Sequence, residues 1–82
     1  MRKRGIFDVV ASILEVLEGG ACNKTTLASR ANLATRSSKR YINMILRFDL
    51  ATKDESTNSF RVTDKGRQFL EEYKKIKRFI GE

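Results

Sequence analysis

The sequence predicts a mainly α-helical domain with one two-stranded β-hairpin, in the order helix, helix, helix, hairpin, helix. Three observations predict this fold class. Apolar residues recur at helical spacing in three segments between residues 6 and 48. Two short segments, residues 50–53 and 59–62, then flank a polar segment, and Phe60 and Val62 alternate with polar residues in the second, which is typical of a hairpin. A last apolar stripe completes a chain of 82 residues, which is enough for one domain.

The first helix is expected over residues 6–18, where a broad apolar face lies opposite acidic and hydroxyl side chains. Gly19 and Gly20 should end it, because glycine readily takes the left-handed conformation of a helix C-cap. A second, short helix is expected over residues 25–31. Its N-cap is Asn23 or Thr25, since either side chain offers an oxygen to free backbone N–H groups.

A third helix is expected over residues 35–48, after a tight turn at Asn32 and Leu33. Its spacing predicts one buried side, made of Tyr41, Ile42, Ile45, Leu46 and Phe48. The other side is polar and holds Arg36, Lys39, Arg40, Asn43 and Arg47.

The hairpin is expected to pair residues 50–53 with residues 59–62, with the polar segment 54–58 as its tip. Thr63 should cap the last helix, residues 64–80, by accepting a hydrogen bond from a backbone N–H group in its first turn. Three helices followed by a two-stranded ribbon make a winged helix, in which a β-hairpin extends a helix-turn-helix.

The last helix divides the single domain into two parts, a winged-helix unit over residues 1–63 and a C-terminal amphipathic helix over residues 64–82. Phe69 and Leu70 should cover the core. Beyond them the apolar stripe extends further than a small domain can bury. It therefore predicts an interface with a second copy of the chain, formed by Tyr73, Ile76, Phe79 and Ile80.

Charge indicates the class of partner. The chain has 17 Lys and Arg against 10 Asp and Glu, and the net charge of +7 favours a polyanion such as DNA. No acidic residue lies between Glu18 and Asp49. The cations in that interval are Lys24, Arg30, Arg36, Lys39, Arg40 and Arg47. The uncompensated positive charge therefore falls on the helix-turn-helix unit.

The expected DNA contacts follow from this charge. We expect the third helix to lie in the major groove, where hydroxyls suit phosphate oxygens and Arg or Asn side chains can bond base edges. The wing adds one cation from each strand. The predicted set is Thr35, Arg36, Ser37, Ser38, Lys39, Arg40, Asn43, Arg47, Lys53 and Arg61. The basic segment 2–4 is as consistent with a DNA-binding arm as with a disordered start.

Other function classes are disfavoured. The chain has no His and one Cys, Cys22, so the commonest general base and the usual zinc ligands are missing. We therefore expect no enzyme, no metal and no cofactor. A single cysteine favours a reducing compartment, and no apolar run has the length of a membrane span. We expect a cytoplasmic, nucleoid-associated protein with no membrane partner.

Several segments resemble a known family. They are Ile13-Leu14-Glu15, Thr26-Leu27-Ala28, Ala31-Asn32-Leu33, Tyr41-Ile42, Ile45-Leu46, and Phe60-Arg61-Val62-Thr63-Asp64-Lys65-Gly66 followed by Phe69-Leu70. The sequence resembles archaeal winged-helix DNA-binding proteins, in particular the small chromatin proteins of the Sulfolobus "ten-a" type. The resemblance implies a transcription regulator or chromatin protein that binds double-stranded DNA through the third helix and the wing. It also implies a homodimer formed by the last helices as an antiparallel coiled coil.

Two features depart from that pattern. The last helix ends near Ile80, which is short for such a coiled coil and predicts a smaller or different dimer. Asp49 stands where a glycine is common before the first wing strand. The alternative to DNA binding is a winged helix whose basic face binds an acidic protein partner. The uninterrupted basic stretch disfavours this reading, because protein interfaces are depleted in lysine.

Overall fold

The computed structural model describes residues 5–81, except for the side chain of Thr35, so the basic segment 2–4 lies outside the described residues. The elements are α1 (Ile6–Glu18), α2 (Lys24–Arg30), α3 (Thr35–Arg47), β1 (Ala51–Asp54), β2 (Ser59–Val62) and α4 (Asp64–Phe79). The predicted helical fold with a two-stranded antiparallel hairpin is confirmed. Four elements differ slightly from the prediction: α2 lies one residue earlier, α3 and α4 end one residue earlier, and β1 lies one residue later.

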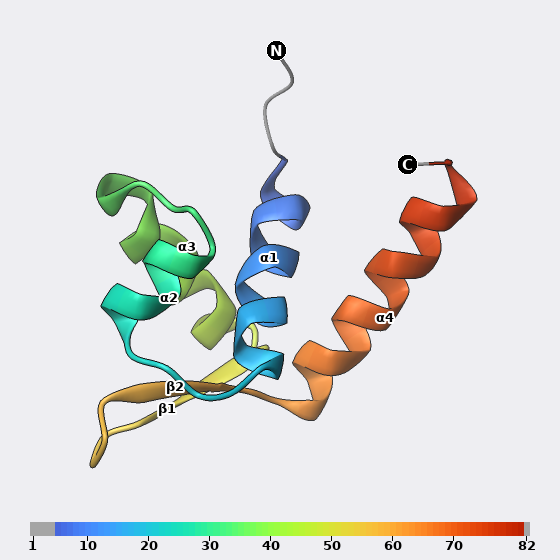
Figure 1. Ribbon diagram of the computed structural model, residues 1–82. Coiled ribbons are helices and arrows are strands. Elements are labelled where there is room, and N and C mark those ends of the chain that lie inside the picture. The colour runs from blue at the N-terminus through green and yellow to red at the C-terminus, as the bar shows by residue number, and fades with distance from the viewer. Residues whose placement is uncertain (1–4, 82) are drawn as a thin grey trace.

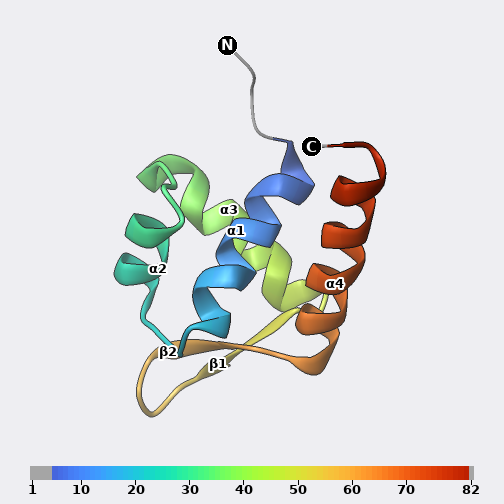
Figure 2. The same ribbon diagram turned by 45° about the vertical axis from the view of Figure 1, so that its right-hand side comes forward.

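The first helix is the centre of the fold. α1 stands between the α2–α3 pair and α4, and the hairpin runs beneath its C-terminal end (Figure 1, Figure 2). Its broad apolar face is needed because several elements pack on it, and its buried residues are Val9, Val10, Ala11, Ile13, Leu14 and Leu17. The other elements contribute large core side chains from every side, among them Leu27, Ile45, Phe60 and Leu70.

The second and third helices end in the same way. Asn32 and Asp49 have φ values of 58° and 59°, in the left-handed region that suits a residue just past a helix end. The following N–H groups, of Leu33 and Leu50, each bond back to a carbonyl five residues earlier, at 2.8 Å. This is the Schellman arrangement, and it shows how Asp49 makes a turn for which glycine is the commoner residue.

The hairpin is joined to the loop between α1 and α2. Its register pairs Thr52 with Arg61 and Lys53 with Phe60. Phe60 also forms an isolated antiparallel bridge with Cys22, through backbone hydrogen bonds of 2.8 and 3.3 Å. The sequence does not predict this bridge, because a bridge of one residue has no periodicity. The bridge ties the start of the helix-turn-helix to the base of the wing.

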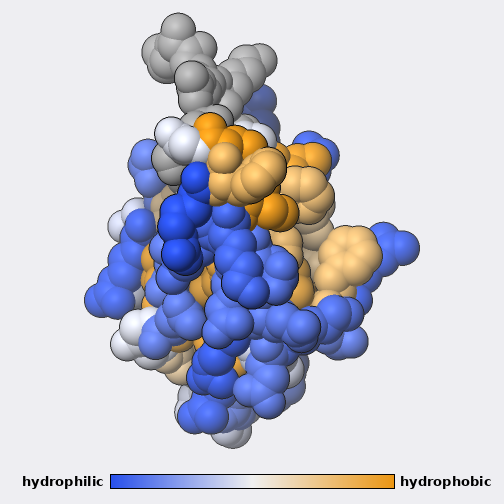
Figure 3. Space-filling view, turned by 90° about the vertical axis from the view of Figure 1, so that its right-hand side faces the viewer, coloured by the Kyte–Doolittle hydropathy of each residue, from blue (hydrophilic) through white to orange (hydrophobic). Residues whose placement is uncertain are grey.

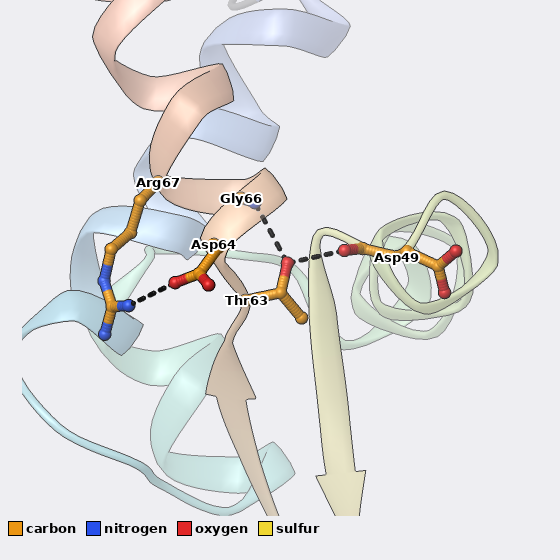
Figure 4. A network of polar contacts seen from close by, with 5 residues as sticks. All are labelled: Asp49, Thr63, Asp64, Gly66 and Arg67. Atoms are coloured by element: carbon orange, nitrogen blue, oxygen red, sulfur yellow. Dashed lines mark hydrogen bonds and ion pairs between the residues drawn. The ribbon is translucent and has the colours of Figure 1, made fainter.

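The junction between the hairpin and α4 is closely packed (Figure 4). The Thr63 hydroxyl accepts from the N–H of Gly66 at 3.0 Å, as predicted, and donates to the carbonyl of Asp49 at 2.5 Å. Gly66 is required here, because a Cβ at this position would lie 2.2 Å from the carbonyl oxygen of Leu50. These contacts fix the first turn of α4 against the end of α3.

Some apolar side chains remain outside the core. Phe48 was expected on the buried side of the third helix but is 54% exposed, so that expectation is wrong. The reason is that α3 ends at Arg47, and Phe48 is the cap residue that turns away from the core. Ile6 and Phe7, in the first turn of α1, are also exposed. Within residues 5–81, no helix is both long enough and apolar enough to cross a membrane.

Candidate nucleic-acid interface

One side of α3 is a cationic surface. Its exposed residues are Arg36, Lys39, Arg40, Asn43 and Arg47, the polar side that the spacing predicted. The opposite side holds Ile42 and Ile45, which are 4% and 0% exposed and fix the helix to the core. Among the described residues, the ion pairs are Arg67–Asp64, Lys75–Glu72 and Lys77–Asp8. None of these involves an α3 cation, so the α3 charges face solvent without an internal counterion.

The first turn of α3 differs from the prediction at one position. Ser38 is 3% exposed, so its side chain does not belong to the surface set. The helical period explains this, because Ser38 lies one turn before Ile42 on the inner side. Ser37 is half-buried. The N-cap residue is Ala34, which makes no side-chain cap, whereas α2 and α4 begin at side-chain caps.

A hollow of about 430 Å³ lies between α2 and the start of α3. Its lining includes polar side chains of α2 that the sequence analysis did not select; the full lining is Lys24, Thr25, Ala28, Ser29, Leu33 and Ser38. The signal available in the sequence was Lys24, which belongs to the acid-free interval. Lys24 therefore adds a cation on α2 beside the start of α3.

A second hollow lies within the cationic surface itself. It has a volume of about 340 Å³ and is lined by Arg40, Asn43, Met44, Arg47 and Phe48. Met44 was not selected from the sequence, because it falls between the polar and the apolar sides of the helical period. Phe48 had been assigned to the core. The structure brings both apolar side chains beside three of the predicted DNA-binding residues.

The two wing cations do not lie together. Directly paired residues of an antiparallel hairpin point to the same face, and successive residues alternate. Lys53 therefore shares the face of Phe60, with its Nζ 5.9 Å from the ring centroid. Arg61 shares the opposite face with Thr52. One backbone strand of a duplex cannot meet both faces at once.

The tip of the wing is acidic. Asp54 accepts hydrogen bonds from the amide and the hydroxyl of Ser56, at 3.0 and 2.7 Å. These bonds hold the pKa of Asp54 below its ordinary value, chiefly through the hydroxyl, so the carboxylate remains ionised near neutral pH. Glu55 follows it in the turn. The tip therefore opposes contact with phosphate, and Lys53 and Arg61 on the strands are better placed for it.

The order of these elements matches a known family. The sequence pattern of the winged helix-turn-helix family covers residues 3–81, nearly the whole chain. The chain belongs to the winged helix-turn-helix family. Among curated proteins, no sequence gives a significant match. In a winged helix-turn-helix, α2 and α3 form the helix-turn-helix, α3 is the recognition helix, and the hairpin is the wing. The family indicates DNA binding in general, whereas the resemblance to the Sulfolobus "ten-a" type remains a prediction.

This winged helix-turn-helix also carries a groove on the side away from α3. The groove measures about 390 Å³ between the first turn of α1 and the second half of α4. Figure 3 shows the side of the molecule on which α4 lies, with apolar surface (orange) gathered near the upper end of the view. Three of the four predicted interface residues are strongly exposed: Ile76 at 59% and Ile80 at 56%, which line the groove, and Phe79 at 88%, which does not.

The fourth predicted interface residue, Tyr73, is half-buried within its own winged helix-turn-helix unit. Its ring stacks on Phe69 with centroids 6.3 Å apart, and its hydroxyl donates to Asp8. Asp8 also accepts from the N–H of Gly5 at 3.1 Å and lies 3.7 Å from the ammonium of Lys77. The Tyr73 hydrogen bond is the main reason why the pKa of Asp8 is lowered and that of Tyr73 is raised. Asp8 thus links α1 to α4.

The cysteine, Cys22, is partly buried. Burial raises the pKa of the Cys22 thiol, against a smaller opposing effect of Arg30. A thiol with a raised pKa is a poor nucleophile at neutral pH. Among residues 5–81, no cluster of three or more His, Cys, Asp or Glu side chains is arranged to hold a metal ion.

Proposed function

We propose that this winged helix-turn-helix protein binds double-stranded DNA as a homodimer, with α3 in the major groove, as a transcription regulator or chromatin-type protein. The observation that carries the proposal is the exposed side of α3. Its cations have no internal ion pair among the described residues and no acidic neighbour between Glu18 and Asp49. A surface of this kind is suited to a row of phosphates, because each phosphate contact releases condensed counterions.

The start of α3 supports contact with the DNA backbone. Ala34 offers no side-chain oxygen to the first N–H groups of the helix. A phosphate oxygen can take that role, since a helix N-terminus carries partial positive charge. Arg36 lies in the same turn and can bond either a phosphate or a guanine edge.

The wing is proposed to contribute through its strands and not through its tip. Lys53 and Arg61 lie on opposite faces, so one of them meets the backbone that flanks the major groove while the other remains solvated. The ionised Asp54 keeps the tip away from phosphate. Replacing Lys53 and Arg61 one at a time therefore should weaken binding unequally.

The groove between α1 and α4 supports a homodimer. Phe69, Tyr73, Ile76 and Ile80 are spaced four, three and four residues apart, the spacing of a coiled-coil seam. Two of these residues are more than half exposed, and Phe79 beside them is the most exposed large apolar residue described. A second copy of the same helix can cover this surface.

The sequence of α4 favours an antiparallel pair. Reading outward from the point between Lys74 and Lys75, the two halves mirror each other in apolar positions. Beyond these two lysines, which carry like charges, the mirrored charges are opposite. An antiparallel pair centred there brings Glu71 and Glu72 level with Arg78 and Lys77 of the second copy. A parallel pair would instead set four cations beside four cations, which is unfavourable. Because α4 has 16 residues, the paired segment would be short, in line with the smaller dimer expected from the sequence.

The proposal is tested by measuring binding to a random duplex of about 30 base pairs across a salt series, with the mass in solution determined alongside. If about 6 phosphates are neutralised, the logarithm of the affinity should fall with the logarithm of salt at a slope near −5. A dimer that binds in this way supports the proposal and a nucleoid-associated location. Absence of binding at low salt would contradict it and would direct the search to an acidic protein partner.

A further inference from the structure

The second hollow on α3 is unusual for a surface that faces phosphates. Residues four apart line up along a helix, so Arg40, Met44 and Phe48 form one row and Asn43 and Arg47 form the next. The hollow between the rows is about 340 Å³. Phe48 is 54% exposed and Met44 is half-buried, so the lining has an apolar part, and the exposed Arg40 and Arg47 make its rim cationic.

The charge of the rim restricts what can occupy the hollow. An apolar group there must arrive in strongly anionic surroundings, because two guanidinium groups stand beside it. The edges of base pairs in the major groove present one such group, the C5-methyl of thymine, and phenylalanine is among the side chains that contact it. Asn43 stands on the same rim and is suited to the adenine that pairs with this thymine.

We propose that the hollow formed by Met44 and Phe48 between Arg40 and Arg47 holds the C5-methyl group of thymine, so that the second half of α3 reads A·T pairs. This inference rests on the proposed DNA-binding function. Phe48 is then a specificity residue, whereas Arg36, about three turns earlier on the helix, contributes to affinity for any sequence.

The test compares two duplexes of about 30 alternating A·T pairs, one with thymine and one with uracil at every T position. The two duplexes carry the same phosphates and the same Watson–Crick hydrogen bonds, and they differ in the methyl group. The expected result is binding at least about fourfold tighter to the thymine duplex, the value of burying one methyl-sized group. Phe48→Ala should bind both duplexes equally, whereas Arg36→Ala should weaken both and keep the ratio.

A second pair of duplexes separates the methyl group from the shape of A·T sequences. Methylating cytosine at C5 in an alternating G·C duplex adds a methyl group at the same edge of the groove. The wild-type protein should gain affinity on methylation, and Phe48→Ala should not. Phe48→Leu keeps an apolar side chain and should retain part of the preference. Because Phe48 is exposed, these variants are expected to fold, which their thermal unfolding checks.

Equal binding of the wild-type protein to thymine and uracil duplexes would overturn the inference and leave the DNA-binding function intact. A preference that survives in Phe48→Ala would also overturn it, because the discrimination would then come from DNA shape. Failure to bind either duplex at low salt would remove the proposed function together with the inference.

Discussion

The two longest helices outside the central one are both cationic and amphipathic, yet they differ in how their charges and apolar sides are used. The α3 cations face solvent without acidic neighbours, and Ile42 and Ile45 bury the other side of the helix. On α4, Glu71 and Glu72 precede four cations and Glu72 pairs with one of them, Lys75, and the apolar side is covered only near Leu70. Both helices are positively charged, so charge alone does not distinguish them. They differ because α4 has internal counterions and uncovered apolar surface.

The two helices are also held at opposite ends. α3 is fixed at its end, where Asp49 completes the Schellman turn, and α4 is fixed at its start, where Thr63 bonds the Asp49 carbonyl (Figure 4). The start of α3 and the end of α4 project away from this junction. One junction therefore supports both proposed surfaces while leaving each open to its own partner.

The largest effect on this arrangement is expected from Gly66→Ala. The new Cβ would lie 2.2 Å from the Leu50 carbonyl oxygen and 2.7 Å from a Val62 methyl group, and backbone must move to relieve the contact. We expect a loss of about 3 kcal/mol in the free energy of unfolding, measured by urea denaturation. Gly5→Ala is the matched control, because its Cβ would make only an ordinary contact. Equal stability of the two variants would contradict the described junction.

The exposed half of α4 is tested by Ile76→Glu. A carboxylate in the seam of a homodimer would be buried without a partner, so the mass in solution should fall to that of one chain. Ile76 is 59% exposed in the single chain, and the variant should therefore remain folded. Gln68→Glu adds the same charge at another exposed position of α4 and should leave the dimer intact. A dimer that persists in Ile76→Glu would exclude this surface as the interface.

A smaller effect is expected from Thr63→Ala. The substitution removes the cap on Gly66 and the hydrogen bond to Asp49, which should cost about 1 kcal/mol. Thr63→Ser keeps the hydroxyl and should recover most of that loss. Thermal or urea unfolding of the three proteins measures it, and an unchanged Thr63→Ala would mean that the cap carries little free energy.

The smallest effect is a pH-dependent one at Asp8. The folded-state pKa of Asp8 lies below its ordinary value of 3.8, first because of the Tyr73 hydroxyl and then because of the Gly5 amide. Ionised Asp8 therefore stabilises the folded state above that ordinary value, and the contribution is lost as the pH falls through the lowered pKa. Asp8→Asn should unfold at a lower temperature than the wild type at pH about 7 and approach it at pH about 2. A difference that does not change with pH would contradict this role.

Local signals predicted the fold well. Asn23 and Thr63 cap the helices that they were expected to cap, because the cap needs only a side-chain oxygen at one position. Gly19 follows the last residue of α1, as expected, but its φ is −75°, and the glycine with positive φ is Gly20, at 144°. The polar side of α3 followed from spacing alone. Such features depend on neighbours within one turn, which a sequence displays directly.

Contacts between distant segments were not predictable in the same way. The bridge between Cys22 and Phe60 joins single residues of two segments, and no sequence pattern predicts it. The hydrogen bond from Tyr73 to Asp8 spans 65 positions. Ser38 and Phe48 were misassigned for a related reason. At the end of a helix, the side that is buried depends on where the neighbouring elements end. The burial of a residue at the border of a helical face therefore cannot be predicted from spacing alone.

The most direct test of the account compares the two cationic helices in one DNA-binding experiment. Arg36→Ala with Lys39→Ala removes two charges from α3, and Lys74→Ala with Lys75→Ala removes two charges from α4. All four side chains are exposed, so both double variants should fold. We expect at least a tenfold loss of affinity for the α3 pair, about 1.4 kcal/mol, and a much smaller loss for the α4 pair. Equal losses would mean that DNA responds only to net charge, and an unchanged affinity of the α3 pair would contradict the assignment of α3 as the DNA-binding helix.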